Sequence, residues 1–236
     1  MTDIRYTGTE LELFADAKKW KSYLADIIGP MLIGPVLEVG AGIGSTARAL
    51  CPPEHSSWTC LEPDPEMAAR LREDATSGRL PTCCHIVQGD TGVFCSGETF
   101  GTVLYVDVLE HIEDDRAELA RASSLLAPGG VLIVMSPAHP FLFSPFDQAV
   151  GHFRRYTRAS LRAVAPPELT LQRLDYLDSV GLLASAANKL LLGQSTPTAS
   201  QIRIWDRGMV LVSRRLDPVL RHRVGKSVLG IWSRQP

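Results

Sequence analysis

Residues 36–50 constrain the fold of this chain more than any other segment. A short apolar run ends at Val39, and glycines then stand at every second position, at Gly40, Gly42 and Gly44. A helical pattern of small and apolar residues follows. The segment therefore predicts a buried strand, a turn too tight for side chains, and a helix whose free N–H groups face the turn. Because glycine has no β-carbon, a ligand can lie directly against this backbone, and we expect one about the size of adenosine.

Three kinds of ligand site begin with a glycine-rich turn, and the neighbouring residues separate them. A phosphate-binding P-loop ends in Gly-Lys-Ser or Gly-Lys-Thr, whereas Gly44 is followed by Ser45 and Thr46 without a lysine. A dinucleotide fingerprint needs its third glycine where this chain has Ser45. The third glycine stands at position 44 instead, which gives the pattern Glu-x-Gly-x-Gly-x-Gly from Glu38. The P-loop is excluded, and the dinucleotide site is disfavoured.

Strands and helices alternate along the chain. Strands are expected at 36–39, 57–61, 85–88, 102–106, 131–135, 169–176 and 227–233, and helices at 11–28, 65–75, 114–126, 158–164, 180–193 and 201–216. Several strands are solidly apolar, which is typical of a parallel sheet covered by helices on both faces. Residues 128–130, Pro-Gly-Gly, are expected to form a turn before the fifth strand. The fold class is therefore α/β.

The helix expected at 11–28 has an apolar face at helical spacing. One interpretation is that this helix packs against the edge of the sheet. The other is that it acts as a lid, in which Tyr6, Phe14, Trp20 or Tyr23 covers a ligand.

Composition excludes several classes of protein. The net charge is −2, so no overall field would draw the chain onto nucleic acid. No apolar run reaches the ~18 residues that span a bilayer, and the N-terminus is too polar for a signal peptide. The five cysteines include no CxxC pair, and the adjacent Cys83 and Cys84 suit neither an ordinary disulfide nor a zinc site. We expect reduced thiols in a soluble, cytoplasmic protein.

Five short motifs follow one another in order. They are Glu38-x-Gly40-x-Gly42-x-Gly44, the acid Glu62, the pair Gly89-Asp90, the segment Asp107-Val-Leu-Glu-His111, and Leu126-x-Pro-Gly-Gly-x-Leu132. Together they resemble the class I S-adenosylmethionine-dependent methyltransferases, closely over residues 35–165 and loosely elsewhere. The resemblance implies a Rossmann-like, doubly wound sheet of seven strands, mostly parallel, with an antiparallel last strand at 227–233.

The same resemblance implies how the chain is divided. We expect a single methyltransferase domain over residues 1–236, with an N-terminal helical cap at 1–30 and a cofactor-binding core at 35–165. A helical insertion at 180–216 would contribute to the acceptor side or to an oligomer contact.

The cofactor implied by the resemblance is S-adenosylmethionine, and the product is S-adenosylhomocysteine. Glu62 is expected to accept hydrogen bonds from both ribose hydroxyls, and Asp90 one from the adenine amino group. Asp107 and Glu38 would place negative charge near the sulfonium, unless Glu38 acts only through its backbone. The remaining cofactor-binding candidates flank these acids or form the glycine turn: Gly40, Ala41, Gly42, Gly44, Pro63, Thr91 and Val108. The alternative for the acids is that they are solvated loop residues.

Residues 138–158 are rich in histidine, arginine and aromatic side chains. In the family, the segment after the fifth strand helps to line the acceptor pocket. His139 and His152 are candidates for a general base, and Tyr156 and its neighbouring arginines could bind an anionic acceptor. The alternative is that Asp147, His152 and the arginines fasten a long loop to the body of the protein. We expect methyl transfer by in-line displacement to a hydroxyl of a small molecule.

The segment that begins at Asp107 also permits a metal site. Asp107, Glu110 and His111 resemble the Glu-x-x-Glu-His cluster with which ubiquinone-type O-methyltransferases and small-RNA terminal methyltransferases bind a divalent metal. The first ligand here is aspartate rather than glutamate, and many metal-free relatives also carry Glu-His. We therefore expect no metal and keep these three residues as candidates.

A basic stretch from Arg203 to Lys226 leaves the choice of partner open. It holds seven Lys and Arg against two Asp, and could attract a membrane surface or a phosphorylated lipid. The alternative is a solvated helix face with a capping or homodimer contact. The alternative functions are N-, S- or C-methylation of a small or lipid-linked acceptor, nucleic-acid methylation, cofactor binding without transfer, and NAD-dependent oxidoreduction. We expect a small-molecule acceptor, no nucleic-acid partner and no integral membrane segment.

Overall fold

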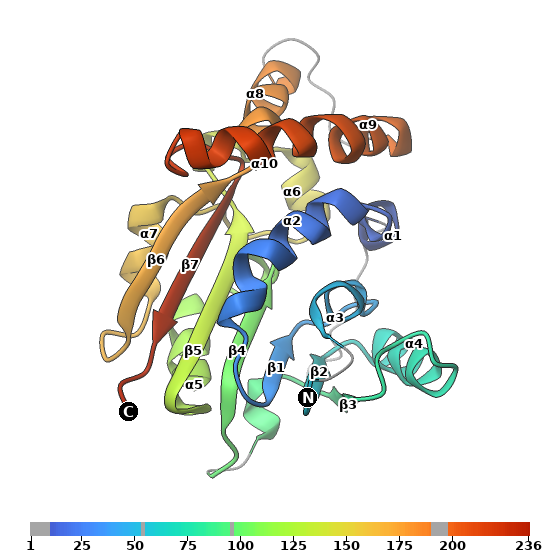
Figure 1. Cartoon of the computed structure of the whole chain (residues 1–236), viewed down its shortest axis with the longest axis vertical. Coiled ribbons are helices and arrows are strands. Elements are labelled where there is room, and N and C mark those ends of the chain that lie inside the picture. The colour runs from blue at the N-terminus through green and yellow to red at the C-terminus, as the bar shows by residue number, and fades with distance from the viewer. Residues whose placement is uncertain (1–9, 53–54, 95–96, 190–197) are drawn as a thin grey trace.

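The computed structural model describes residues 10–52, 55–94, 97–189 and 198–236. Seven strands form one sheet in the order β3-β2-β1-β4-β5-β7-β6 (Figure 1). The strands are β1 (Val36–Val39), β2 (Trp58–Glu62), β3 (Cys84–Gln88), β4 (Phe100–Val106), β5 (Leu126–Pro137), β6 (Thr170–Leu177) and β7 (Ser227–Ser233). Strands β1 to β5 are parallel, and β7 runs antiparallel to both β5 and β6. The predicted α/β fold with an antiparallel last strand is confirmed.

Helices cover both faces of the sheet. They are α1 (Glu10–Ala15), α2 (Lys18–Ile28), α3 (Ser45–Leu50), α4 (Pro65–Thr76), α5 (Asp115–Ser124), α6 (Pro145–Ala149), α7 (Arg158–Val164), α8 (Ser179–Ala187), α9 (Ala199–Ile204), the π-helical η6 (Trp205–Met209) and α10 (Val210–Val219). Successive residues of a strand point to opposite faces of the sheet and so belong to different cores. Val36 packs in the core formed with α2 and α3, and Leu37 packs in the core formed with α5 and α7. Because both faces are covered, the central strands β1 and β4 are buried at nearly every position, whereas the edge strands β3 and β6 also carry exposed polar residues.

The functional edge of the sheet follows from the strand order. The chain runs outward from β1 to β3 and then returns to β4 on the other side of β1, which makes a topological switch point. Ligands of such sheets bind at the carboxyl ends of the strands beside that point. The continuous helical segment α9–η6–α10 lies across this end of the sheet, together with α6 (Figure 1).

The prediction of one helix at 11–28 is wrong, because the chain breaks between α1 and α2. The N–H of Lys18 donates to the carbonyl of Asp16 at 2.7 Å. The N–H of Trp20, which a longer helix would satisfy itself, donates to the carboxylate of Asp206 at 2.9 Å. A carboxylate from η6 therefore caps the start of α2.

Two further expectations need correction. The segment 128–130 is an irregularity inside β5: Phe100 pairs with Leu126, and Thr102 pairs next with Val131. The basic helix expected at 201–216 is divided by the π-helical turn η6, and the apolar helix expected at 180–193 is α8, with its last four positions outside the described residues. Within the described ranges, no helix is both long and apolar enough to cross a bilayer.

Candidate active site

The glycine turn after β1 brings its backbone close to the segment that follows β4. Gly40, Gly42 and Gly44 have φ angles of 67°, 55° and 74°, a left-handed region that side chains disfavour. A β-carbon on Gly40 would lie 2.7 Å from Cγ2 of Val108. Ala41 is buried, and its N–H donates to the carbonyl of Leu61 at 3.0 Å. Glycine is therefore required here both by the turn and by the close approach of Val108.

Glu62 links this turn to the end of β2. Its Oε2 accepts a hydrogen bond from the N–H of Gly42 at 2.7 Å, and its Oε1 accepts one from the N–H of Asp64 at 2.9 Å. Burial raises the pKa of Glu62, and the two N–H donors oppose that shift. Each oxygen still has a lone pair for a further donor. The carboxylate is thus positioned by backbone groups and can serve two ligand hydroxyls.

The carboxylate of Glu38 is engaged by the protein itself. Its Oε2 accepts from the indole N–H of Trp58 at 2.7 Å, inside the core formed with α3. Burial raises the pKa of Glu38 to about 8, so the carboxyl is neutral at pH 7. The side chain therefore supplies no negative charge to a sulfonium, and a contribution through its backbone stays a prediction.

Asp90 and Thr91 have different environments at the end of β3. Asp90 is exposed, and its Oδ1 accepts from the N–H of Gly92 at 2.8 Å. Thr91 is buried, and its hydroxyl donates to Glu118 at 3.0 Å. Asp90 can meet a ligand, whereas the Thr91 side chain fastens the turn to α5. Pro63 lies in the short connection between Glu62, at the end of β2, and the start of α4. As a proline, it has no backbone N–H to donate to a ligand.

Asp107 stands directly after β4 with a φ of 55°, and its N–H donates to the carbonyl of Met135 at 2.9 Å. Its side chain keeps contact with solvent. The protein around the site nevertheless removes water from the carboxylate and raises the pKa of Asp107 to about 6. Charges on His152, Lys226 and Arg155 oppose this shift. Asp107 therefore lies near the basic side chains of His152, Arg155 and Lys226, and its carboxyl group titrates just below neutral pH.

His152 is the predicted base that the structure brings nearest to this acid. Its Nδ1 lies 2.9 Å from Oδ1 of Asp147, which Arg155 also contacts at 2.7 Å. Burial alone would raise the pKa of Asp147, but hydrogen bonds from His152 and Arg155 hold it well below its usual range. An ionised Asp147 accepts the Nδ1–H proton of His152 and leaves Nε2 as the basic nitrogen.

The other two predicted catalytic residues are held elsewhere. The ring of His139 stacks on Tyr176 with centroids 4.7 Å apart, and its Nε2 lies 2.9 Å from the carbonyl of Gly225. Tyr156 is buried and donates to Asp115 at 2.7 Å, at the start of α5. Burial and that hydrogen bond raise the pKa of the Tyr156 hydroxyl well above its usual range. Both side chains fasten residues 138–158, the predicted acceptor loop, which favours the loop-fastening alternative for these two residues.

The proposed metal ligands are only partly assembled. Ligand atoms of Glu110, His111 and His152 all lie within 4.8 Å of one another, whereas Asp107 does not join them. Glu110 is fully buried, and neither of its oxygens has a hydrogen-bond partner among the described residues. Two imidazoles and one carboxylate form a donor set that divalent transition metals accept. The sequence alone did not connect His152 to this group, because it comes from a loop about forty residues further along.

Lys226 belongs to the basic stretch for which the sequence left the choice of partner open. Its Nζ lies 3.9 Å from the centroid of the Trp205 ring and 3.8 Å from Oδ2 of Asp178. Burial lowers the pKa of Lys226 below its ordinary value. The nearby carboxylates of Asp178 and Asp107 offset only part of this shift. Lys226 therefore lies near both Asp178 and Asp107, and nothing in its sequence neighbourhood distinguishes it from the exposed arginines.

Helix α1 lies over the glycine turn. A β-carbon on Gly42 would lie 3.4 Å from Cδ1 of Leu11, and Glu12 forms an ion pair with Arg70 of α4. Phe14 contacts Trp205 at 5.9 Å between ring centroids, while Trp20 and Tyr23 are buried. The covering element is thus α1 rather than the aromatic face of α2. Tyr6, the remaining lid candidate, lies outside the described residues.

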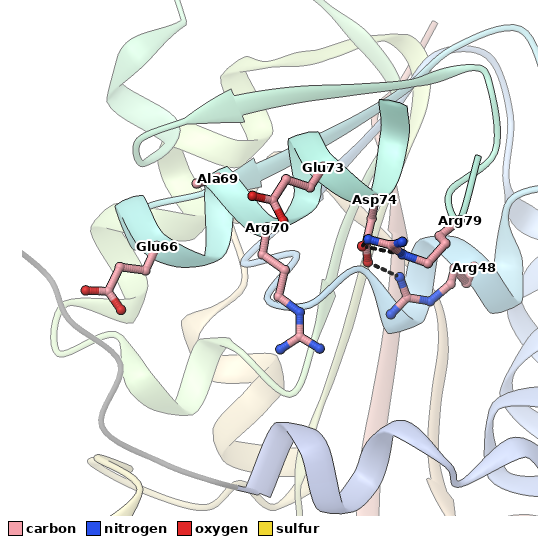
Figure 2. A pocket seen from close by; sticks show the side chains of 7 residues that line it. All are labelled: Arg48, Glu66, Ala69, Arg70, Glu73, Asp74 and Arg79. Atoms are coloured by element: carbon pink, nitrogen blue, oxygen red, sulfur yellow. Dashed lines mark hydrogen bonds and ion pairs between the residues drawn. The ribbon is translucent and has the colours of Figure 1, made fainter. Parts of the chain in front are cut away.

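A pocket of about 870 Å³ lies against α4, and its lining includes Arg70 (Figure 2). At one end of this pocket, Asp74 pairs with Arg48 at 3.0 Å and Arg79 at 2.6 Å (Figure 2). Arg48 also donates to the carbonyl of Ile43 at 2.6 Å. These ion pairs satisfy the charged groups at that end of the pocket, and the pocket contains none of the strand-end acids.

The comparison with protein families decides the identity of the fold. Residues 37–132 match the methyltransferase domain family. They are a methyltransferase domain. The matched range contains the glycine turn, Glu62, Asp90, Asp107 and the start of β5. The chain is therefore an enzyme of the methyltransferase type, and its cofactor is S-adenosylmethionine.

Solved structures support the fold at low sequence identity. A candidate methyltransferase in complex with the Trm112 activator of Haloferax volcanii is 15% identical, with a TM-score of 0.65 over 99% of this chain and 100% of that one. N-methyltransferase NodS of Bradyrhizobium japonicum WM9, solved with S-adenosylhomocysteine, is 14% identical, with a TM-score of 0.60 over 94% and 89%. A candidate sarcosine dimethylglycine methyltransferase of Galdieria sulphuraria is 17% identical, with a TM-score of 0.60 over 92% and 84%. No curated protein matches the sequence significantly.

The residues at the strand ends fit this cofactor. Both oxygens of Glu62 retain a lone pair for ribose hydroxyls, and Asp90 is accessible for an amino group. Arg48, the basic residue nearest in sequence to the turn, is already engaged by Asp74 and Ile43. A nucleoside without phosphates needs no cation at this position, in agreement with the missing lysine.

Proposed function

We propose that this enzyme transfers a methyl group to a hydroxyl oxygen of a small-molecule acceptor in the cytoplasm. The observation that carries the proposal is the pairing of His152 with Asp147 at 2.9 Å, which leaves Nε2 basic beside Asp107 and Glu110. A hydroxyl acceptor must lose its proton during or before attack, whereas a neutral amine is already nucleophilic. A base held by a carboxylate is therefore what an O-methyltransferase needs.

The cofactor site of the proposal consists of Glu62 on the ribose, Asp90 on the adenine, and the backbone of Gly40, Ala41, Gly42 and Gly44. When bound, S-adenosylmethionine supplies an electrophilic methyl group on a sulfonium and leaves as S-adenosylhomocysteine. Asp107, beside the turn, is the acid that offers negative charge to that cation. Leu11 and α1 exclude water from the turn.

On the acceptor side, His152 Nε2 accepts the hydroxyl proton, and Asp147 stabilises the imidazolium that forms. Lys226 and Arg155 keep this region positive, which favours an anionic or phenolic acceptor over a cationic one. The net charge of −2 gives no long-range attraction to nucleic acid. A homodimer through the exposed apolar residues of α10 belongs to the same proposal, and sedimentation velocity tests it.

A screen of hydroxyl and amine acceptors with methyl-labelled cofactor tests the proposal. We expect label on oxygen, a fall in kcat of about 10²–10³-fold in His152→Ala, and unchanged affinity for S-adenosylhomocysteine. The matched control is His139→Ala, which should retain kcat within several-fold. Label on nitrogen alone, with full turnover in His152→Ala, would overturn the O-methyl assignment and leave an N-methyltransferase.

A metal-assisted transfer is the second candidate, and the unpartnered carboxylate of Glu110 between two histidines favours it. The three side chains would hold a divalent cation that lowers the pKa of the acceptor hydroxyl. Elemental analysis of the purified enzyme and turnover after exhaustive chelation test this version. Full activity of a metal-free sample would exclude it.

A further inference from the structure

A cluster of thiols lies toward the amino ends of the strands, away from the candidate active site. Cys51 ends α3, Cys60 lies in β2, and Cys83 and Cys84 stand at the start of β3. The sulfur atoms of Cys51, Cys83 and Cys84 all lie within 4.8 Å of one another, and those of Cys51 and Cys83 are 3.2 Å apart. Local spacing does not predict this grouping, because Cys51 and Cys83 are 32 positions apart in the chain.

Rigid backbone holds the two closest sulfur atoms. The N–H of Cys51 donates to the carbonyl of Ala47 at the end of α3, and the carbonyl of Cys83 accepts from the N–H of Trp58, both at 3.0 Å. Cys51 is buried, whereas Cys83 is only partly buried, so a reagent can reach the pair from the Cys83 side. A bond between these sulfur atoms needs side-chain adjustment and no rearrangement of strands or helices.

The electrostatic environment favours a neutral product at this cluster. Burial raises the pKa of the Cys51 thiol, and a hydrogen bond to Cys84 together with burial raises that of Cys60. Hydrogen bonds from Cys60 and the other thiols lower the pKa of Cys84. A thiolate-bound metal requires several ionised sulfur atoms in this buried place, whereas the disulfide that forms after thiolate attack carries no charge.

We propose that Cys51 and Cys83 form a reversible disulfide that fastens the end of α3 to the start of β3. The two thiols lose two protons and two electrons as the S–S bond forms. A low-molecular-weight disulfide such as oxidised glutathione accepts them and leaves as two thiols. The bond closes a loop that contains all of β2 and α4, so it restricts the unfolded chain and stabilises the part of the sheet that carries Glu62.

The full-length protein, equilibrated in glutathione buffers of increasing oxidising strength and then alkylated, tests this inference. We expect a species two hydrogen atoms lighter, a Cys51–Cys83 link in the peptide map, and a Tm about 5–10 °C higher, all reversed by dithiothreitol. The link should be absent in Cys51→Ser and Cys83→Ser and retained in the matched control Cys95→Ser.

Three results would overturn the inference. One is full alkylation of Cys51 and Cys83 at every glutathione ratio. Another is a link that survives Cys83→Ser and disappears in Cys84→Ser, which would assign the bond to Cys84. The third is stoichiometric Zn²⁺ binding by the reduced protein without any cross-link, which would make the cluster a metal site. None of these results bears on methyl transfer, so the inference and the proposed function fail independently.

Discussion

The cofactor side and the acceptor side of this enzyme are built in different ways. On the cofactor side, backbone groups position the proposed ligand-binding atoms: Gly42 and Asp64 hold the carboxylate of Glu62 through their N–H groups. On the acceptor side, side chains position side chains: Asp147 holds His152 and Arg155 together. A site fixed by backbone tolerates changes in most neighbouring side chains, whereas a site fixed by one carboxylate depends on that residue. Substitutions can therefore separate the two sides.

The largest effect is expected on the acceptor side, at Asp147. Its carboxylate is buried and accepts hydrogen bonds from Ser144, His152 and Arg155. Asp147→Ala leaves Arg155 without its anion, and we expect unfolding to require about 3–5 kcal/mol less free energy. Urea denaturation measures this, and the affinity for S-adenosylhomocysteine should stay within about threefold in the folded fraction.

Asp114→Ala is the matched control, because that aspartate only caps α5 at an exposed site and should cost about 1 kcal/mol. If the two variants lose the same stability, Asp147 does not organise the acceptor loop.

The second effect concerns Glu38, on the cofactor side. Its pKa is raised from an ordinary value of 4.5 to about 8 by burial, so its contribution to stability is fully present below pH 4.5 and is lost as the pH rises toward 8. Glu38→Gln keeps an acceptor for Trp58 and does not ionise. Relative to this variant, the wild type should lose about 3 kcal/mol of unfolding free energy between pH 5 and pH 7.5. Parallel denaturant curves across this range measure the difference, and a constant difference would show that Glu38 is ionised in the folded protein.

The smallest effect is expected at the cover of the cofactor turn. Glu12 and Arg70 form an ion pair in which both side chains are about half exposed, and such pairs contribute little. Glu12→Gln should change the calorimetric dissociation constant of S-adenosylhomocysteine by about twofold or less. A tenfold change would mean that the Glu12–Arg70 ion pair, rather than the contact of Leu11, holds α1 over the glycine turn.

The same contrast explains what the sequence could predict. The order of strands and the glycine turn follow from local patterns, because apolar runs and left-handed glycines are properties of neighbouring residues. The location of Glu62 at a strand end also follows from the pattern. The break between α1 and α2 does not, because its cap is Asp206, 186 residues from Trp20.

Long-range contacts account for the remaining errors. The charge state of Glu38 depends on Trp58 and on burial in a core that the sequence does not display. Cys51, at the end of α3, and Cys83, just before β3, come together only in the folded chain. Among the candidate bases, His152 and His139 are equivalent in the sequence, and only the contacts to Asp147 and to Gly225 separate them.

The central claim is that Glu62 and the glycine turn bind the cofactor while His152 acts only on the acceptor. Calorimetric titration of S-adenosylhomocysteine into the wild type, Glu62→Ala and His152→Ala tests it directly. We expect a dissociation constant about 100-fold higher in Glu62→Ala, equal to about 2.7 kcal/mol, and an unchanged one in His152→Ala. Equal affinities in all three proteins, or tight binding of NAD in place of S-adenosylhomocysteine, would contradict the account.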